Sequence, residues 1–460
     1  MSLQIIQKPL YKVIPAESSI YYSVSDTTSV ATKFKVKYVA DVHTLGNSNN
    51  AITSNNLVNT VKVSPNAVGV GVIDLKSILS SQVDVCQTGI GSTFKGGAGL
   101  HSVHLIDGMS KDGKGVIYYV VNFRVEYSDT ASGVVSDSGQ SVTDDVRLIY
   151  NGYLRNNDVL QFDGVNYGYD LELNSYILND SSAKFLTDMP NEVNARLDDY
   201  GTISFFDNLT VAGEGLQVGT NNAGDKKVNN IRVSFYSDTA GLGIHIINDI
   251  NSVSQNRTDK RVSVGIYPAN IVNVYGNFPT GTTHYTFQAL DNDSQAISRE
   301  YTIRILCDDA KGYEGIRLAW INQFGVFDYY TFNKKSIRTL NSKRNNYTQH
   351  NGTWNGSFHE INGYKGGTKS YNVSSKEQLT INTDYISEEE GIYLENLIMS
   401  NEVYIIHQNE ATDSTGTVNK YIEPVMLLSN SLQRKTIAND KLINHTFSIE
   451  KSKTTNTQRL

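Results

Sequence analysis

Apolar and polar residues alternate with a period of two in several stretches spread along the chain. In each stretch every second side chain is apolar or aromatic, and the residues between are mostly polar or charged. The alternating sets are Phe34, Val36 and Tyr38; Val121, Phe123, Val125 and Tyr127; Ile231, Val233 and Phe235; and Ile443, His445, Phe447 and Ile449. Strands of antiparallel sheets show this pattern when one face is buried and the other faces water. The pattern predicts an all-β fold, mainly of antiparallel β-sandwich domains.

Breaks in the pattern indicate where domains begin and end. Asp-Gly and Asn-Gly pairs, which favour tight turns, punctuate the strands. A strand system ends near Met189-Pro190, and another ends in the Asp-rich segment 307–312. We expect an N-terminal β region at 1–190 with one or two modules, a middle β-sandwich domain at 191–310, and a C-terminal β domain at 311–460.

One helix is predicted, over residues 387–399. Ser387 and Glu390 have the spacing of a capping box, in which each side chain bonds the backbone N–H of the other residue. Leu394, Leu397 and Ile398 follow on one face. Because a strand-like segment comes next, at 403–406, we expect the helix to cover an edge or a face of the C-terminal domain.

Composition and charge limit the kinds of molecule that the chain is expected to bind. The chain of 460 residues has 28 Tyr, 2 Trp and a formal charge of −7 from 40 Lys and Arg against 47 Asp and Glu. No long run of basic residues interleaved with aromatic ones supplies a basic face, so we expect no nucleic-acid binding. Tyrosine is enriched at protein interfaces and also stacks on sugars; we favour interface contacts and keep sugar binding as the alternative.

The two cysteines and the lengths of the apolar runs indicate in which cellular compartment the chain folds. Cys86 and Cys307 are too few for a disulfide framework, and we favour two buried thiols over a bridge between them. The N-terminus has no pattern of a signal peptide, and no apolar run is long enough to cross a bilayer. We therefore expect synthesis in the cytoplasm and no membrane span.

Segments that could carry chemistry each lack a required element. Residues 91–96 resemble a phosphate-binding loop but are followed by Gly-Ala where a Walker motif has Lys-Ser/Thr. His101, His104 and Asp107 offer metal ligands, but we favour ordinary loop and strand residues. Asp291 and Asp293 are spaced as in calcium loops, yet a hairpin turn is favoured because the rest of the EF-hand pattern is missing.

Adjacent carboxylates are the remaining candidates. They occur at Asp144-Asp145, Asp198-Asp199 and Asp308-Asp309. Glycosidases use two carboxylates on opposite sides of the scissile bond, whereas neighbouring residues on a strand face opposite ways. We interpret these pairs as surface acids and assign no catalytic, cofactor-binding or metal-binding residue.

Residues 315–332 carry the most distinctive motif. It has the form R-x-x-W-x-N-x-x-G-x-x-D-x-x-T-F, beginning at Arg317 and ending at Phe332, and a Lys- and Ser-containing stretch follows at 333–338. The motif resembles a segment of structural tail and neck proteins of tailed bacteriophages, crAss-like and related phages of marine and Bacteroidetes hosts. Residues 379–405 and 435–450 resemble the end of the same family, and 196–205 more weakly. Residues 1–150 resemble nothing specific.

The resemblance implies a function and brings no catalytic residues. It implies a non-enzymatic virion protein: a subunit of a tail hub, baseplate or neck ring that anchors fibres. Its partners would be copies of itself in a ring and other tail, neck or fibre proteins, assembled in the host cytoplasm. The alternatives are a receptor- or glycan-binding fibre or adhesin protein, and a polysaccharide-degrading enzyme that uses a pair such as Asp198-Asp199.

Overall fold

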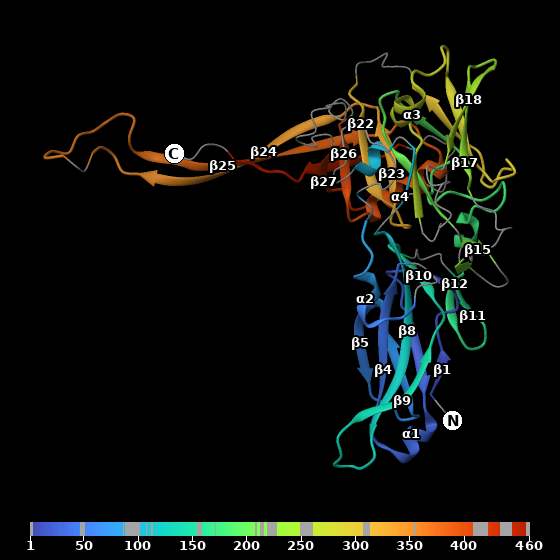
Figure 1. Cartoon of the computed structure of the whole chain (residues 1–460). Coiled ribbons are helices and arrows are strands. Elements are labelled where there is room, and N and C mark those ends of the chain that lie inside the picture. Colours follow the sequence, from blue (N-terminus) through green and yellow to red (C-terminus); the bar gives the residue numbers. More distant parts are fainter. Residues whose placement is uncertain are drawn as a thin grey trace. The chain divides into compact units, whose positions relative to one another are not determined.

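The computed structural model divides the chain into two compact units. Unit 1 comprises residues 1–306, 321–328 and 411–419, and unit 2 comprises 307–320, 329–410 and 420–460. The structure describes residues 3–46, 51–85, 87, 102–106, 108–111, 114–153, 159–170, 172–207, 209–211, 216–218, 228–248, 261–306, 313–353, 356–407, 422–432 and 444–456. Strands dominate both units, which confirms the all-β prediction (Figure 1). The predicted boundaries near residues 190 and 310 stay predictions.

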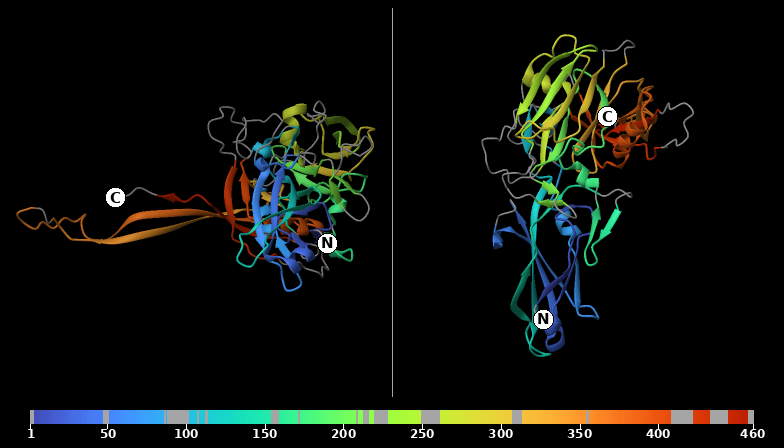
Figure 2. Two further views of the ribbon diagram at one scale, coloured as in Figure 1. Left: turned by 60° about the horizontal axis from the view of Figure 1, so that its bottom comes forward. Right: turned by 90° about the vertical axis from the view of Figure 1, so that its right-hand side faces the viewer.

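The N-terminal part of unit 1 is a sandwich of two sheets (Figure 2). The smaller sheet has the order β1-β3-β6, with bounds Gln4–Gln7, Tyr21–Ser25 and Val70–Asp74. The larger sheet has the order β2-β10-β8-β4-β5, and β9 pairs with β8; the bounds are Val13–Pro15, Arg147–Tyr150, Val116–Ser128, Phe34–Leu45, Leu57–Val63 and, for β9, Ser136–Thr143. All these pairings are antiparallel except β2 with β10.

Alternate residues of both sheets form the core between them. Tyr22 and Val24 of β3 and Phe123 and Val125 of β8 are fully buried in one cluster. The predicted alternation along β8 is thus confirmed.

The rest of unit 1 is built on two further sheets and two hairpins. A five-stranded sheet has the order β13-β21-β20-β17-β18, with bounds Glu192–Ala195, Tyr301–Ile305, His284–Leu290, Asn230–Tyr236 and Gly241–Asn248. A three-stranded sheet has the order β14-β19-β7, with bounds Thr202–Phe206, Arg261–Gly265 and Met109–Lys111. The hairpins are β11-β12 (Val159–Phe162, Tyr167–Asp170) and β15-β16 (Leu209–Val211, Leu216–Val218). Phe185 packs against Phe205 and Phe287 of the two sheets.

Unit 2 contributes most of an eight-stranded antiparallel sheet of order β23-β22-β26-β27-β28-β25-β24, with β29 paired to β25. The bounds are Phe327–Phe332, Ile316–Ile321, Val403–Ile406, Ile422–Leu427, Thr446–Lys451, Gly367–Asn382, Ile337–Gln349 and, for β29, Thr455–Asn456. Strands β24 and β25 are much longer than the others, so their far ends leave the sheet as a two-stranded ribbon (Figure 1).

Helices are short in the described part of the chain. The α-helices are α1 Thr27–Thr32, α2 Lys76–Ser80, α3 Pro268–Tyr275 and α4 Glu388–Met399, and 3-10 turns span Ser54–Asn56, Ser102–Leu105 and Glu172–Tyr176. Within those residues no helix has the length and apolar character needed to cross a membrane.

Helix α4 is the predicted helix, and its capping box is confirmed. The Ser387 hydroxyl accepts from the Glu390 N–H at 3.1 Å, and the Glu390 carboxylate accepts from the Ser387 N–H at 2.8 Å. Leu394 and Leu397 are buried as expected. Tyr393 adds a contact that the pattern did not predict, since its ring packs 5.2 Å from that of Trp320.

A tight turn joins β22 to β23 within the motif of residues 317–332. The Asn322 carbonyl accepts from the Gly325 N–H at 3.0 Å, and the Asn322 side chain accepts from the Phe324 N–H at 2.9 Å. Gly325 has a φ of 69°, and a Cβ there would overlap the carbonyl oxygen of Asn151. Both residues are therefore required by backbone geometry.

One predicted core position is wrong. Phe34 was expected to share the buried face of its strand with Tyr38, but half of its surface is exposed, whereas Tyr38 is fully buried. The register of β4 against β8 shifts between Phe34 and Lys37, and Lys35 has a φ of 55°. This irregularity breaks the alternation, because it turns the side chain of Phe34, which precedes it, away from the buried face.

The cap of α4 can be tested directly. We expect Ser387→Ala to destabilise the first turn of α4 by about 1 kcal/mol, because the Glu390 N–H loses its acceptor. Hydrogen exchange at residues 390–393 should accelerate about fivefold. Ser387→Thr keeps the acceptor and is the control; equal exchange in the two variants would contradict the role of the cap.

Candidate interaction surfaces

An open pocket lies on the outer side of the β1-β3-β6 sheet in unit 1. Its volume is about 500 Å³, and its walls are Gln7, Lys8, Pro9, Tyr11, Val13, Ile14, Pro15, Ser18, Ser19, Tyr21, Ser23, Val72, Tyr167 and Gly168. Tyr21, Tyr167 and Val72 are each about half exposed. The pocket is therefore mainly apolar, with aromatic rings where it opens to solvent.

The local sequence explains how the pocket forms. Along β3 the residues alternate, so Tyr22 and Val24 enter the core while Tyr21 and Ser23 face the pocket. The β11-β12 hairpin is held against the start of the chain by a hydrogen bond from the Leu10 N–H to the Tyr167 carbonyl, 2.8 Å long.

Several polar groups of the pocket already have partners within the chain. The Ser18 hydroxyl donates to the Pro15 carbonyl at 2.7 Å. The Gln7 side chain accepts from the Ser23 hydroxyl at 3.2 Å and donates to the Val165 carbonyl at 2.9 Å. Since these donors are engaged, the pocket suits an apolar group better than a hydroxyl-rich one.

A buried ion cluster adjoins the pocket at Lys8. Asp144, whose side chain is fully buried, binds the Arg147 guanidinium at 2.7 Å and the Lys8 ammonium at 2.9 Å. The Tyr22 hydroxyl also donates to Asp144, at 2.9 Å. The Lys8 ammonium lies 3.4 Å from Asp145 as well. Two cations thus face two carboxylates, so Lys8 adds little net charge to the pocket.

Burial and charge shift the pKa values in this cluster in opposite directions. Burial alone would raise the pKa of Asp144, but the guanidinium of Arg147 and the ammonium of Lys8 outweigh it and hold that pKa below its usual value. Burial raises the pKa of Tyr119 to about 12. Asp144 is therefore ionised and structural, and Tyr119 is neutral at physiological pH.

The interpretation of the carboxylate pairs as surface acids is wrong for Asp144 and Asp199, which are buried, whereas Asp145 is exposed and Asp198 is partly exposed. Asp144 belongs to the ion cluster, while Asp145 is largely exposed. Asp198 pairs with Arg196 at 3.6 Å, and the buried Asp199 accepts from the Arg196 N–H at 2.8 Å. The pair at 308–309 lies outside the described residues.

The described residues among the candidates for metal or phosphate binding have structural contacts. Asp291 is a turn residue, as favoured: its carboxylate accepts from the N–H groups of Asp293 and Gln295. His104 is buried with its ring 4.5 Å from that of Phe327. His101, Asp107, Cys86, Cys307 and the loop 91–96 lie outside the described residues. The described part of the chain holds no group of three or more metal-ligating side chains.

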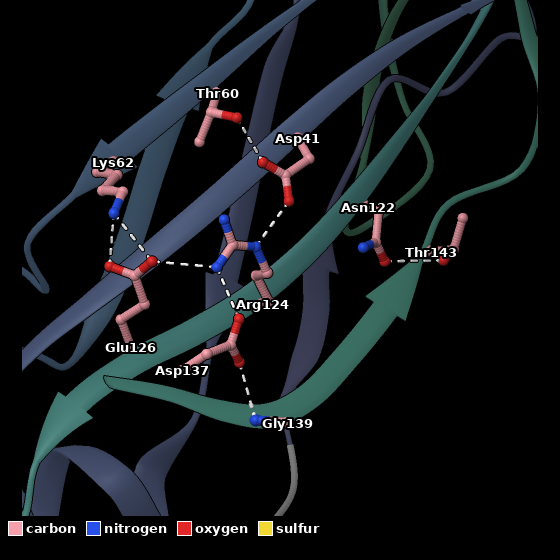
Figure 3. Close-up of polar contacts among 9 residues, drawn as sticks. All are labelled: Asp41, Thr60, Lys62, Asn122, Arg124, Glu126, Asp137, Gly139 and Thr143. Carbon is pink, nitrogen blue, oxygen red and sulfur yellow. Dashed lines mark hydrogen bonds and ion pairs between the residues drawn. The ribbon is translucent and has the colours of Figure 1, made fainter. Parts of the chain in front are cut away.

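A polar network covers the outer face of the larger N-terminal sheet (Figure 3). Arg124 of β8 bridges Asp41 at 2.7 Å, Glu126 at 3.0 Å and Asp137 at 2.7 Å, and Glu126 also binds Lys62. Backbone donation from Gly139, aided by Arg124, lowers the pKa of Asp137. The network ties β4, β5, β8 and β9 together where the sheet faces water, so we assign it to stability.

The ribbon formed by β24 and β25 is the second candidate surface; we call it the arm. Leu379 is the buried residue of β25 nearest the free end, and Gly367, where the strand begins, lies twelve residues before it. At about 3.4 Å per residue the arm extends about 40 Å beyond this core residue. The side chains of β24 are exposed on both faces along nearly the whole strand.

The segment that closes the arm is described at residues 350–353 and 356–366, which we call the tip, and its described apolar side chains face solvent although hydrogen bonds order the backbone. Thr353 donates its N–H to the Glu360 carbonyl, and Asn362 donates to the Thr353 hydroxyl at 2.8 Å. Phe358, Ile361 and Tyr364 are nevertheless 82%, 82% and 72% exposed. Three large apolar side chains this exposed on one short segment make the tip a candidate interaction surface.

Sequence reasoning missed both surfaces. The pocket joins segments that are more than 140 residues apart, so no local pattern could show it. The arm lacks a buried face and therefore lacks the alternation by which strands were found. A signal was present in the sequence 350–366, where four large apolar or aromatic residues, Trp354, Phe358, Ile361 and Tyr364, occur among Gly, Asn and Ser.

Comparisons with known proteins do not assign the chain to a family. No protein-family model and no curated protein matches the chain. Among solved structures it is similar to dimeric latent PorU from Porphyromonas gingivalis, with 8% identity and a TM-score of 0.16, covering 83% of this chain and 32% of that one. It is also similar to E. coli alpha-2-macroglobulin, with 8% identity and a TM-score of 0.18, covering 82% and 22%. The chain thus spans a third or less of either protein, and likeness this weak carries no argument about function.

The ion cluster yields a prediction about acid stability. Asp144→Asn leaves the buried Arg147 without its carboxylate partner and should cost about 3–5 kcal/mol at pH 7. Because the folded pKa of Asp144 is lowered, the stability it contributes is present above its unfolded pKa of about 3.9 and disappears as the pH falls through the folded value. The variant should therefore lose less stability than the wild type below pH 4.

Hydrogen exchange of the β8 and β10 amides, compared at pH 7 and pH 3, measures this difference. Asp145→Asn is the matched control, since Asp145 is largely exposed, and it should change stability by less than about 0.5 kcal/mol. Equal effects of the two substitutions would rule out a special role for Asp144.

Proposed function

We propose that this chain is a non-enzymatic structural subunit of the virion of a tailed bacteriophage, located in a tail hub, baseplate or neck ring. The observation that carries the proposal is the arm with its folded apolar tip. A ribbon that places an apolar patch about 40 Å from the nearest buried residue of its own strand serves contact with another chain. The resemblance of residues 315–332, 379–405 and 435–450 to phage tail and neck proteins supplies the class of assembly.

The proposed mechanism is assembly. Copies of the chain pack side by side through their β domains into a ring, and exposed loops and arms contact neighbouring subunits, adjacent rings or fibres. A closed ring requires contacts between two different surfaces of each subunit, a donor and an acceptor. The partners would be copies of this chain and other tail, neck or fibre proteins, joined in the host cytoplasm.

The two alternative functions have less support. A glycan site needs polar groups ready to bond sugar hydroxyls, whereas Ser18, Ser23 and Gln7 of the pocket are bonded to the chain itself. A glycosidase needs a carboxylate that reaches the substrate, whereas Asp199 is fully buried and bonded to the backbone of Arg196. Both remain alternatives from the sequence.

Localisation tests the proposed function. Particles of the phage that encodes this chain should be purified on a density gradient and their proteins quantified by mass spectrometry. We expect the chain at a constant number of copies per particle, with antibody label at the tail or the neck in electron micrographs. An abundant cytoplasmic host protein is the negative control. Absence of the chain from particles that contain the capsid and tail proteins would refute the proposal.

A further inference from the structure

The tip of the arm needs a partner outside its own domain. Its three exposed apolar residues, Phe358, Ile361 and Tyr364, are held on a folded segment rather than on a loose loop. Ordering these residues costs conformational entropy, and no burial within the described arm offsets that cost. Because the arm carries the tip about 40 Å from Leu379, another chain is the natural source of the missing burial.

Two arms are not expected to pair along their exposed strand edges, because these edges carry like charges. Strand β24 ends the eight-stranded sheet, so its outer edge has no partner among the described strands. Lys343 and Arg344 lie on this edge strand and are exposed. Two arms that met edge to edge would bring these like charges together, and lysine on an edge strand is a common protection against such pairing. The contact is therefore expected at the tip.

Charge favours the body of a second copy as the partner. Residues 339–376 hold five Lys or Arg and one Glu, a net charge of +4. Because the whole chain carries −7, all its other residues together carry −11. An arm approaching the body of another copy is thus attracted by opposite net charge.

The pocket in unit 1 has the character that the tip requires. It is open and mainly apolar, has a volume of about 500 Å³ and is rimmed by Tyr21 and Tyr167. Its one cation, Lys8, is neutralised by Asp144 and Asp145, so it does not repel a basic arm. Aromatic residues that enter a well-formed pocket are the usual anchors of protein interfaces.

We propose that the tip of the arm inserts Phe358 and Ile361 into the Tyr21–Tyr167 pocket of a second copy of this chain. The inference rests on the proposed function and specifies one contact of the assembly. Donor and acceptor are different surfaces, so each copy gives its tip to one neighbour and receives the tip of another. Such a contact closes into a ring or grows into a filament.

Mixing of two defective full-length variants tests the contact. Phe358→Ser with Ile361→Ser removes the donor, and Val72→Lys places a charge at the acceptor. Each variant alone should bind itself at least about 30-fold more weakly than the wild type, as expected when an anchor is removed. A 1:1 mixture should form a species of two chains and nothing larger, because each pair keeps one intact donor and one intact acceptor.

Matched controls separate the contact from general surface effects. Leu340→Ser changes an apolar residue on the arm that is 70% exposed but outside the tip. Val134→Lys makes the same change as Val72→Lys at a position of unit 1 that is 89% exposed. Both controls should assemble like the wild type in sedimentation velocity experiments.

Three results would overturn the inference. One is a wild-type chain that stays monomeric at about 100 µM, another is undiminished assembly of either defective variant, and the third is a mixture without a two-chain species. None of them bears on whether the chain occurs in virions. If the chain occurs in virus particles but fails the mixing test, the proposed function stands and the proposed contact is wrong. The tip would then bind another arm or a different virion protein.

Discussion

The turn between β22 and β23 closes the first hairpin of the eight-stranded sheet, and a set of buried hydrogen bonds fixes it. Asn322 closes the turn with its backbone and its side chain, and its amide group also donates to the Leu186 carbonyl and to Asp328. Asp328 in turn accepts from the Thr187 hydroxyl at 2.6 Å. Every polar group named here is buried, so loss of any one would leave another without its partner.

The same hairpin shows why the motif of residues 317–332 has its form. Arg317 and Thr331 face each other across the hairpin and are joined by a hydrogen bond of 2.8 Å. Trp320 is fully buried against Tyr393 of α4, and Phe332 packs against Phe447 of β28. The motif positions are therefore explained by packing, hydrogen bonding and backbone geometry. A motif of this kind identifies a fold more directly than an activity.

Sequence patterns predicted the elements that have one buried face and failed where that condition does not hold. The alternation in β8, β17 and β28 and the cap of α4 follow from local physical rules, and the structure agrees with them. Phe34 is misplaced because Lys35 adopts a left-handed backbone conformation that its residue type does not favour. The arm was not predicted because a strand exposed on both faces has no period-two signal, and its register is set by backbone hydrogen bonds with β25.

The candidate surfaces were harder still to predict, since each is defined by what remains unburied. In the pocket, Tyr21 is exposed because its neighbour Tyr22 fills the core, so the same Tyr-Tyr pair provides both a core residue and a surface ring. In the arm, the basic residues that keep β24 from pairing with a like edge also give the arm a charge opposite to that of the rest of the chain. Protection against edge pairing and attraction toward a surface of opposite charge are therefore properties of the same few side chains.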